Sequence, residues 1–230
     1  MNIKEVLLIT DDHESARMLA HGLVMRGVQV DIAAISSHLH QRDEIARYTL
    51  VIVDTDRTDG VVLCRQLRSD YHNPLLFLTY ERDERYQLLV YEAGVDDCIQ
   101  KPIGNSLFLA KVDVWLRATH FRNSGYGQRA QNFQLDLARR QLALPEGRVV
   151  TLTQLEIRLV ELFLSNPNIT LETGTIIRRV WNDYCEGDST LLKNLIYRVR
   201  RKIESAPHEP QYIQTTFGGY IFRTDSIQVE

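Results

Sequence analysis

Short apolar runs alternate with segments of helical periodicity through the first half of the chain. The apolar runs end abruptly in polar residues and comprise Val6–Ile9, Leu50–Val53, Leu75–Leu78 and Cys98–Ile99. Segments between or after them carry apolar residues at helical spacing, over about residues 14–26, 61–69, 82–93 and 106–119. Such an alternation predicts an α/β domain in which helices cover both faces of a (βα)5 doubly wound parallel sheet.

The second half of the chain has a different pattern. Phe133–Leu144 and Arg148–Leu152 have the pattern of short antiparallel strands around a turn at residues 145–147. Thr153 and Glu156 have the spacing of a capping box, which predicts that a helix begins there. Two further helices are expected at about 175–181 and 189–204, followed by a β-hairpin that joins residues 212–215 to 220–223. Three helices and a hairpin predict an α+β winged helix-turn-helix domain.

Length and charge support this division. The chain has 230 residues, enough for two small domains. Residues 1–120 carry 13 Lys and Arg against 18 Asp and Glu, whereas residues 121–230 carry 14 against 12. Residues 121–131 lose the apolar periodicity and are predicted to be a linker. We therefore expect a regulatory or catalytic domain in residues 1–120 and a polyanion-binding domain in residues 132–226.

The composition argues against several classes of protein. No apolar run approaches the roughly 18–20 residues of a membrane span, and the N-terminus does not have the pattern of a signal peptide. The three cysteines, Cys64, Cys98 and Cys185, lack the spacing of a metal site. We interpret them as reduced thiols of a cytoplasmic protein that does not bind membranes. A redox role for one of them stays open.

The ends of the predicted strands hold the candidate chemistry: Asp11, Asp12, Asp54, Thr79 and Lys101. Because parallel strands end at one edge of a sheet, we expect these side chains to converge. Three carboxylates at close range repel one another unless a cation lies among them, and Mg²⁺ prefers oxygen ligands. Asp54 can attack a phosphoryl group that the Lys101 ammonium and the Thr79 hydroxyl neutralise and position. The simpler alternative is a set of ordinary solvated turn residues.

This pattern, with Glu92–Asp97 ahead of Lys101 and Pro102, resembles the receiver domain of bacterial two-component response regulators. The resemblance implies that Asp54 accepts a phosphoryl group from a sensor histidine kinase, and that Thr79 and Lys101 contact this group. It also implies a Mg²⁺ site. Its implied ligands are the carboxylates of Asp11, Asp12 and Asp54 and the backbone carbonyl of Asp56.

Three departures from the family pattern keep an alternative open. Cys98 stands where the family has an aromatic residue, Tyr80 stands where it has a small one, and the loop after Asp54 is shorter and lacks a proline. The alternative is a regulator of the same architecture that acts without phosphorylation or responds to another signal. A remoter one is a phosphatase, because residues 54–58 also fit the Asp-nucleophile motif of haloacid-dehalogenase-type enzymes. The order of the other motifs argues against an enzyme.

The last predicted helix is apolar on one face and basic on the other. At about 100° per residue, its apolar face holds Leu191, Leu192, Leu195, Ile196, Val199 and Ile203. The opposite face holds Lys193, Asn194, Tyr197 and Arg201, and the flanks hold Arg198, Arg200 and Lys202. Such a helix suits the DNA major groove, with side chains for base edges and flanking cations for phosphates. The alternative is a solvated basic face.

Several parts of the second half resemble the effector domain of the OmpR/PhoB subfamily of response regulators: Trp181, Tyr197–Glu204, Ile213–Thr215 and Gly218–Tyr220. The resemblance implies a transcription factor that binds double-stranded promoter DNA as a homodimer, with RNA polymerase as a candidate partner. The implied dimer face is formed by the last two receiver helices and the strand between them, with charged positions at Asp97, Lys111 and Arg117. The wing is shorter than usual and uncharged.

Overall fold

The computed structural model describes residues 4–35, 44–118, 129–130, 132–181 and 189–224. The chain divides into two compact units, residues 1–120 and 121–230. Most of the predicted linker at 121–131 lies outside the described residues, so its bounds stay a prediction.

The first unit is built on a parallel five-stranded sheet, as predicted. Its strands are β1 (Glu5–Thr10), β2 (Gln29–Ala33), β3 (Leu50–Asp54), β4 (Leu75–Thr79) and β5 (Asp97–Gln100), in the order β2-β1-β3-β4-β5. Every residue of β3 and β4 is buried, which explains their continuous apolar sequences. Asp54 pairs with Thr10 on β1 and with Leu78 on β4, so the polar ends of the central strands lie side by side.

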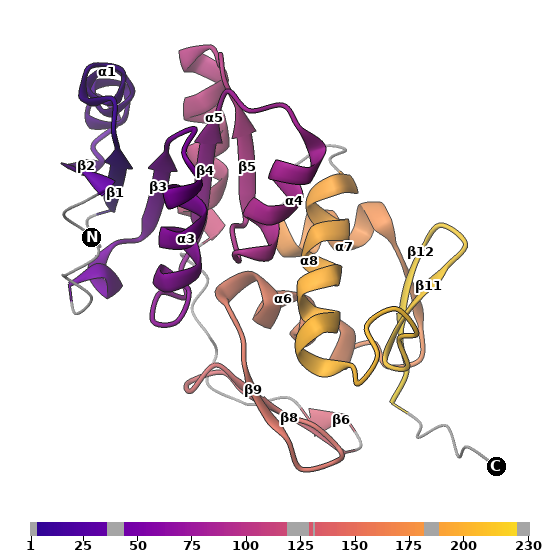
Figure 1. Ribbon diagram of the computed structural model, residues 1–230. Coiled ribbons are helices and arrows are strands. Elements are labelled where there is room, and N and C mark those ends of the chain that lie inside the picture. The colour runs from indigo at the N-terminus through magenta and orange to yellow at the C-terminus, as the bar shows by residue number, and fades with distance from the viewer. Residues whose placement is uncertain (1–3, 36–43, 119–128, 131, 182–188, 225–230) are drawn as a thin grey trace. The chain divides into compact units, whose positions relative to one another are not determined.

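In the described residues, the helices that accompany the sheet lie close to the predicted ranges: α1 (His13–Val24), α3 (Thr58–Leu67), α4 (Glu84–Glu92) and α5 (Asn105–Ala118). Helix α1 contacts α5, and α3 contacts α4. Figure 1 shows α3 in front of the sheet and α5 behind it. The described part of the β2–β3 connection contains a short 3₁₀ helix, Ile45–Arg47. Trp115 of α5 is buried, which agrees with a packing role for this side chain.

The second unit begins with an antiparallel sheet in the order β6-β7-β8-β9, with strands at Arg129–Ala130, Phe133–Asp136, Gln141–Ala143 and Val149–Thr151. The predicted segment Phe133–Leu144 thus contains two strands. They are separated by a turn in which Arg140 has a φ of 56°. Strand periodicity does not reveal such a turn, because it contains neither glycine nor proline.

The remaining elements of the second unit form the winged helix. Three helices, α6 (Gln154–Leu164), α7 (Thr173–Trp181) and α8 (Ser189–Ile203), pack against one another. Strands β11 (Ile213–Thr216) and β12 (Gly219–Phe222) form the predicted hairpin. A short strand that the sequence did not predict, β10 (Thr170–Glu172), also pairs with β12. Phe222 of β12 packs on Phe133 and Phe163, and Trp181 is buried.

Candidate functional site

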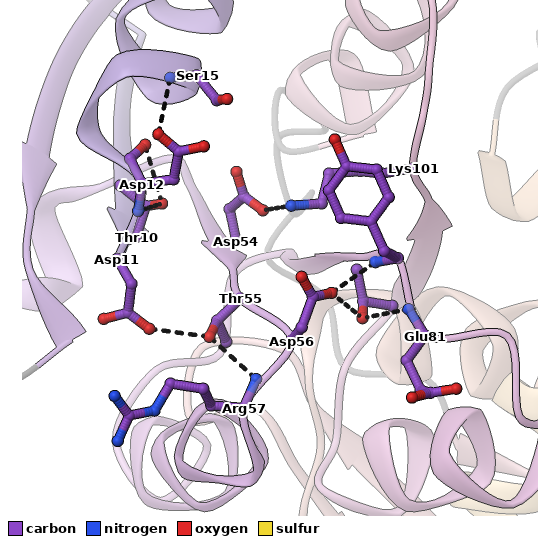
Figure 2. A network of polar contacts seen from close by, with 12 residues as sticks. Thr10, Asp11, Asp12, Ser15, Asp54, Thr55, Asp56, Arg57, Glu81 and Lys101 are labelled. Atoms are coloured by element: carbon purple, nitrogen blue, oxygen red, sulfur yellow. Dashed lines mark hydrogen bonds and ion pairs between the residues drawn. The ribbon is translucent and has the colours of Figure 1, made fainter.

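Asp54 ends β3 and is almost completely buried, with 2% of its surface exposed. Its Oδ1 atom is 2.5 Å from the Lys101 ammonium (Figure 2). Its Oδ2 atom is buried and has no hydrogen-bond partner among the described residues. Burial raises the pKa of the Asp54 carboxyl, and the contact with Lys101 opposes this rise. The site therefore holds a carboxylate with one neutralised oxygen and one free oxygen.

Lys101 follows β5, and its backbone N–H donates to the Thr79 carbonyl at 2.7 Å. This bond fixes the end of β5 to the end of β4. The ring of Tyr80 lies over the Lys101 ammonium, with the nitrogen 4.4 Å from the ring centre. Tyr80 is itself 56% exposed. An aromatic residue at this position therefore covers the cation of the site from the solvent side.

The two acids after β1 have separate partners. Asp12 caps α1, where its Oδ1 accepts the N–H groups of Glu14 and Ser15 at 3.1 Å. The hydrogen bonds with Ser15 are the main cause of the lowered pKa of Asp12. Asp11 accepts the Thr55 hydroxyl at 3.0 Å instead. Figure 2 shows Asp11, Asp12 and Asp54 pointing toward different partners.

This arrangement corrects the expectation of three converging carboxylates. Among the residues described, no three Asp, Glu, His or Cys side chains form a ready-made metal-ligand group. The physical reason is that each carboxylate lowers its energy by accepting a hydrogen bond from its own nearby donor. The site still suits Mg²⁺ chemically, because its oxygen donors include the buried and unpartnered Oδ2 atom of Asp54.

Thr79 ends β4, and its hydroxyl donates to Oδ1 of Asp56 at 2.8 Å. The same oxygen accepts the backbone N–H of Tyr80 at 2.6 Å. The sequence suggested only a backbone role for Asp56, so this side-chain contact was missed. A motif cannot reveal it, because the rotamer of Asp56 depends on the three-residue connection between β3 and α3.

Helix α8 buries the predicted apolar face, and all six of its apolar residues are buried: Leu191, Leu192, Leu195, Ile196, Val199 and Ile203. The opposite face exposes Lys193, Tyr197 and Arg201, and Asn194 is half-buried. The Asn194 amide nitrogen has no hydrogen-bond partner in the described part of the chain. This face is therefore polar, partly aromatic and accessible.

The flanks of α8 differ from the prediction. Arg198 is buried, with 8% exposed, so its predicted place on an exposed flank is wrong. Arg200 donates to the Ile213 carbonyl at 2.9 Å and to the Thr215 hydroxyl at 3.0 Å. The Lys202 ammonium lies 2.6 Å from the buried Glu156 carboxylate. Arg200 and Lys202 thus make contacts within the winged helix that the sequence did not predict, and their binding to phosphates stays a prediction.

The hairpin tip has a feature that the sequence analysis did not single out. Phe217, between β11 and β12, is fully exposed, and Gly218 beside it has a φ of 81°. The positive φ explains the glycine, because other residues rarely adopt this conformation. An aromatic residue that faces solvent at the end of a hairpin does not stabilise a core.

The residues of the predicted dimer face are in the first unit. Asp97 is buried on β5 and pairs with Lys111 of α5 at 3.2 Å. Arg117 belongs to α5, but its side chain lies outside the described part. Exposed leucines accompany these residues on α4 and α5: Leu88, Leu89 and Leu107.

The cysteines show no sign of an activated thiol in the described residues. Burial raises the pKa of Cys98 to about 12, with the Asp97 charge as a second cause. Burial raises the pKa of Cys64 to about 12 as well. Cys185 lies outside the described residues.

Known proteins match both halves of the chain. Residues 6–113 match the family "Response regulator receiver domain", and residues 147–222 match "Transcriptional regulatory protein, C terminal". The transcriptional activator protein IrlR of Burkholderia pseudomallei is 32% identical and aligns over 96% of each chain. The regulatory protein VirG of Agrobacterium fabrum is 32% identical, over 97% of this chain and 91% of VirG.

A solved structure matches the fold of the whole chain. The structure of a RitR mutant superimposes with a TM-score of 0.73, over 96% of this chain and 99% of that one. Its sequence identity of 19% supports a shared fold alone. None of the helices in the described ranges is long and apolar enough to cross a membrane.

Proposed function

Because this chain belongs to the two-component response regulators of the OmpR/PhoB type, with a receiver domain and a DNA-binding transcriptional regulatory domain, we propose that Asp54 is its phosphoryl acceptor. The observation that carries the proposal is the Asp54 carboxylate, buried at the end of β3 with one oxygen on Lys101 and the other unpartnered among the described residues. Response regulators of this type receive the phosphoryl group from a sensor histidine kinase and bind DNA.

The proposed chemistry is nucleophilic transfer. An oxygen of Asp54 attacks the phosphorus of a phosphohistidine, the P–N bond breaks, and a mixed carboxylic–phosphoric anhydride forms. Lys101 and Thr79 stabilise negative charge on the transferred group. Asp11, Asp12, Asp54 and the Asp56 carbonyl would hold Mg²⁺, which would supply further charge neutralisation.

Intact mass spectrometry tests the acceptor directly. After incubation with Mg²⁺ and acetyl phosphate, the wild type is expected to gain one phosphoryl adduct and Asp54→Ala none. Asp59→Ala is the matched control, because Asp59 is an exposed acid of the same region that pairs with Arg57. No adduct on the wild type, or an equal adduct on Asp54→Ala, would contradict the proposal.

A second candidate is a regulator of the same architecture that acts without phosphorylation. The observation that favours it is the Tyr80 ring over Lys101, which covers the cation that would meet a phosphoryl group. This candidate predicts equal DNA binding by the unmodified wild type and by Asp54→Ala, with no gain after phosphodonor treatment.

We propose that the chain is a regulator and not an enzyme. The Asp-nucleophile phosphatases place their nucleophile motif early in the domain, whereas Asp54 ends the third strand here. Turnover of a phosphate ester in the presence of Mg²⁺ would overturn this proposal.

The proposed DNA contacts are the accessible residues of α8, Lys193, Asn194, Tyr197 and Arg201. The proposed homodimer uses the face of α4, β5 and α5. Exposed leucines lie on α4 and α5, and the Asp97–Lys111 pair joins β5 to α5. The target is double-stranded promoter DNA in the cytoplasm, and RNA polymerase is the further proposed partner.

A further inference from the structure

Asp56 lies two residues beyond the proposed acceptor, Asp54. Its Oδ1 atom accepts two hydrogen bonds, from the Thr79 hydroxyl at 2.8 Å and from the Tyr80 backbone N–H at 2.6 Å. Both donors lie at the end of β4, the strand that pairs with β3. Figure 2 shows the Asp56 carboxylate making these contacts on the side of the site away from Asp11.

Each of these donors has a single hydrogen to give. A hydroxyl proton that Thr79 donates to Asp56 is not available to a phosphoryl oxygen, and the same holds for the Tyr80 N–H. Hydrogen bonds to a carboxylate are charge-assisted and stronger than those between neutral groups. A phosphoryl group at these donors must therefore displace an anion that is already bound to them.

We propose that Asp56 is a positioning residue, a proposal that rests on the proposed function. In the unphosphorylated site its carboxylate occupies the two hydrogen-bond donors, the Thr79 hydroxyl and the Tyr80 N–H, that would otherwise bind phosphoryl oxygens. Its side chain must leave Thr79 and Tyr80 before these groups can stabilise the phosphoryl group on Asp54. Asp56 thus takes the place of the phosphoryl oxygens while Asp54 is unphosphorylated, and it slows phosphoryl acceptance.

A neighbouring acid provides the matched comparison. Oε1 of Glu81 accepts the backbone N–H groups of Arg82 and Asp83, at 2.9 and 3.1 Å. The carboxylate of Glu81 thus bonds to the loop that follows it, whereas the hydroxyl of Thr79 and the N–H of Tyr80 donate to Asp56. Glu81→Gln removes a nearby negative charge and leaves the hydrogen bonds from Thr79 and Tyr80 to Asp56 in place.

The first measurement is the initial rate of phosphoryl adduct formation with acetyl phosphate and Mg²⁺, followed by intact mass. In this reaction an Asp54 oxygen attacks the phosphorus and acetate leaves. Asp56→Ala is expected to react at least about tenfold faster than the wild type, because two charge-assisted hydrogen bonds need not break. Asp56→Asn keeps an acceptor oxygen without the charge and is expected to be intermediate, and Glu81→Gln is expected to match the wild type.

The second measurement needs no phosphodonor and no metal. Hydrogen exchange of the Tyr80 amide, observed by NMR, is expected to be at least about tenfold faster in Asp56→Ala than in the wild type and Glu81→Gln. This measurement detects directly whether the Tyr80 N–H is hydrogen-bonded.

The outcomes separate the two proposals. If the wild type forms the adduct as fast as Asp56→Ala, or if the Tyr80 amide exchanges equally in both, Asp54 remains the acceptor and the role of Asp56 is overturned. If no variant forms the adduct, the proposed phosphorylation fails and the inference fails with it. Equal acceleration by Glu81→Gln would overturn the inference in favour of a general charge effect.

Discussion

The two carboxylate oxygens of Asp54 lie in unequal surroundings. One oxygen is neutralised by Lys101, and the other is buried without a partner among the described residues. An unpartnered buried oxygen is energetically costly, and it is also the oxygen that needs least desolvation to react. At the scale of single residues, the site therefore combines a stabilised charge with a reactive atom.

A second buried ion pair stabilises the first unit away from the site. Arg68 pairs with Asp96 and donates to the carbonyls of Gly94, Tyr71 and Asn73. Arg68→Ala would remove the cation that pairs with the buried Asp96 carboxylate and would leave it the N–H of Leu75, so we expect the free energy of unfolding to fall by about 3–5 kcal/mol. Urea denaturation provides the measurement. Arg57→Ala breaks the exposed pair with Asp59 and should cost less than about 1 kcal/mol; equal losses for the two variants would refute the prediction.

The thiol of Cys98 is expected to be unreactive. Burial and the Asp97 charge raise its pKa to about 12, so at pH 8 only on the order of one thiol in ten thousand is ionised. Iodoacetamide should therefore modify Cys98 at least about a hundredfold more slowly in the native protein than in urea. Peptide mapping distinguishes this residue from Cys64 and Cys185. Modification of Cys98 at the same rate in both conditions would show an activated thiol.

At the scale of elements, α8 shows what helical periodicity predicts well and what it misses. The apolar face was predicted correctly because spacing alone determines which side chains share a side. The roles of its cations depend on neighbouring elements. At about 100° per residue, Lys202 lies within about 20° of the buried Leu195. Its stem thus follows the apolar face to Glu156, which also caps α6 by accepting the Thr153 N–H.

Two cations of α8 should therefore respond differently to substitution. Arg201→Ala is expected to weaken binding to duplex DNA by about tenfold or more and to make binding less salt-dependent. Lys202→Met is expected to leave affinity unchanged and to lower the free energy of unfolding by about 1–3 kcal/mol, because Glu156 loses a charged partner. Fluorescence anisotropy over a range of salt concentrations measures the affinity for DNA. The duplex is one that the wild type has selected from a pool of random sequences. Similar affinity losses in both variants would contradict this assignment.

The identities of the site residues could be predicted, but their orientations could not. Strand-end positions follow from apolar runs, so Asp54, Thr79 and Lys101 were expected at one edge of the sheet. The side-chain partners of Asp11, Asp12 and Asp56 depend on loop conformation and on nearby hydrogen-bond donors. Strand β10 was missed for a related reason, because three residues are too few to show a period.

At the scale of the molecule, each unit has its own buried core, and the proposed dimer face belongs to the first unit. Lys111→Glu would place a second carboxylate beside that of Asp97, so we expect the proposed dimer to dissociate after phosphodonor treatment. Sedimentation velocity measures the oligomeric state. Arg17→Glu is the matched charge reversal on the exposed side of α1. A dimer that survives Lys111→Glu would rule out this face.

The chain contains two tryptophans, and both are buried, Trp115 in the first unit and Trp181 in the second. Each unit thus carries one indole whose fluorescence will change when that unit unfolds. With Trp115→Phe or Trp181→Phe, a single emission signal comes from one unit inside the full-length protein. The molecule therefore has built-in optical probes that can reveal whether its two halves melt together or one after the other.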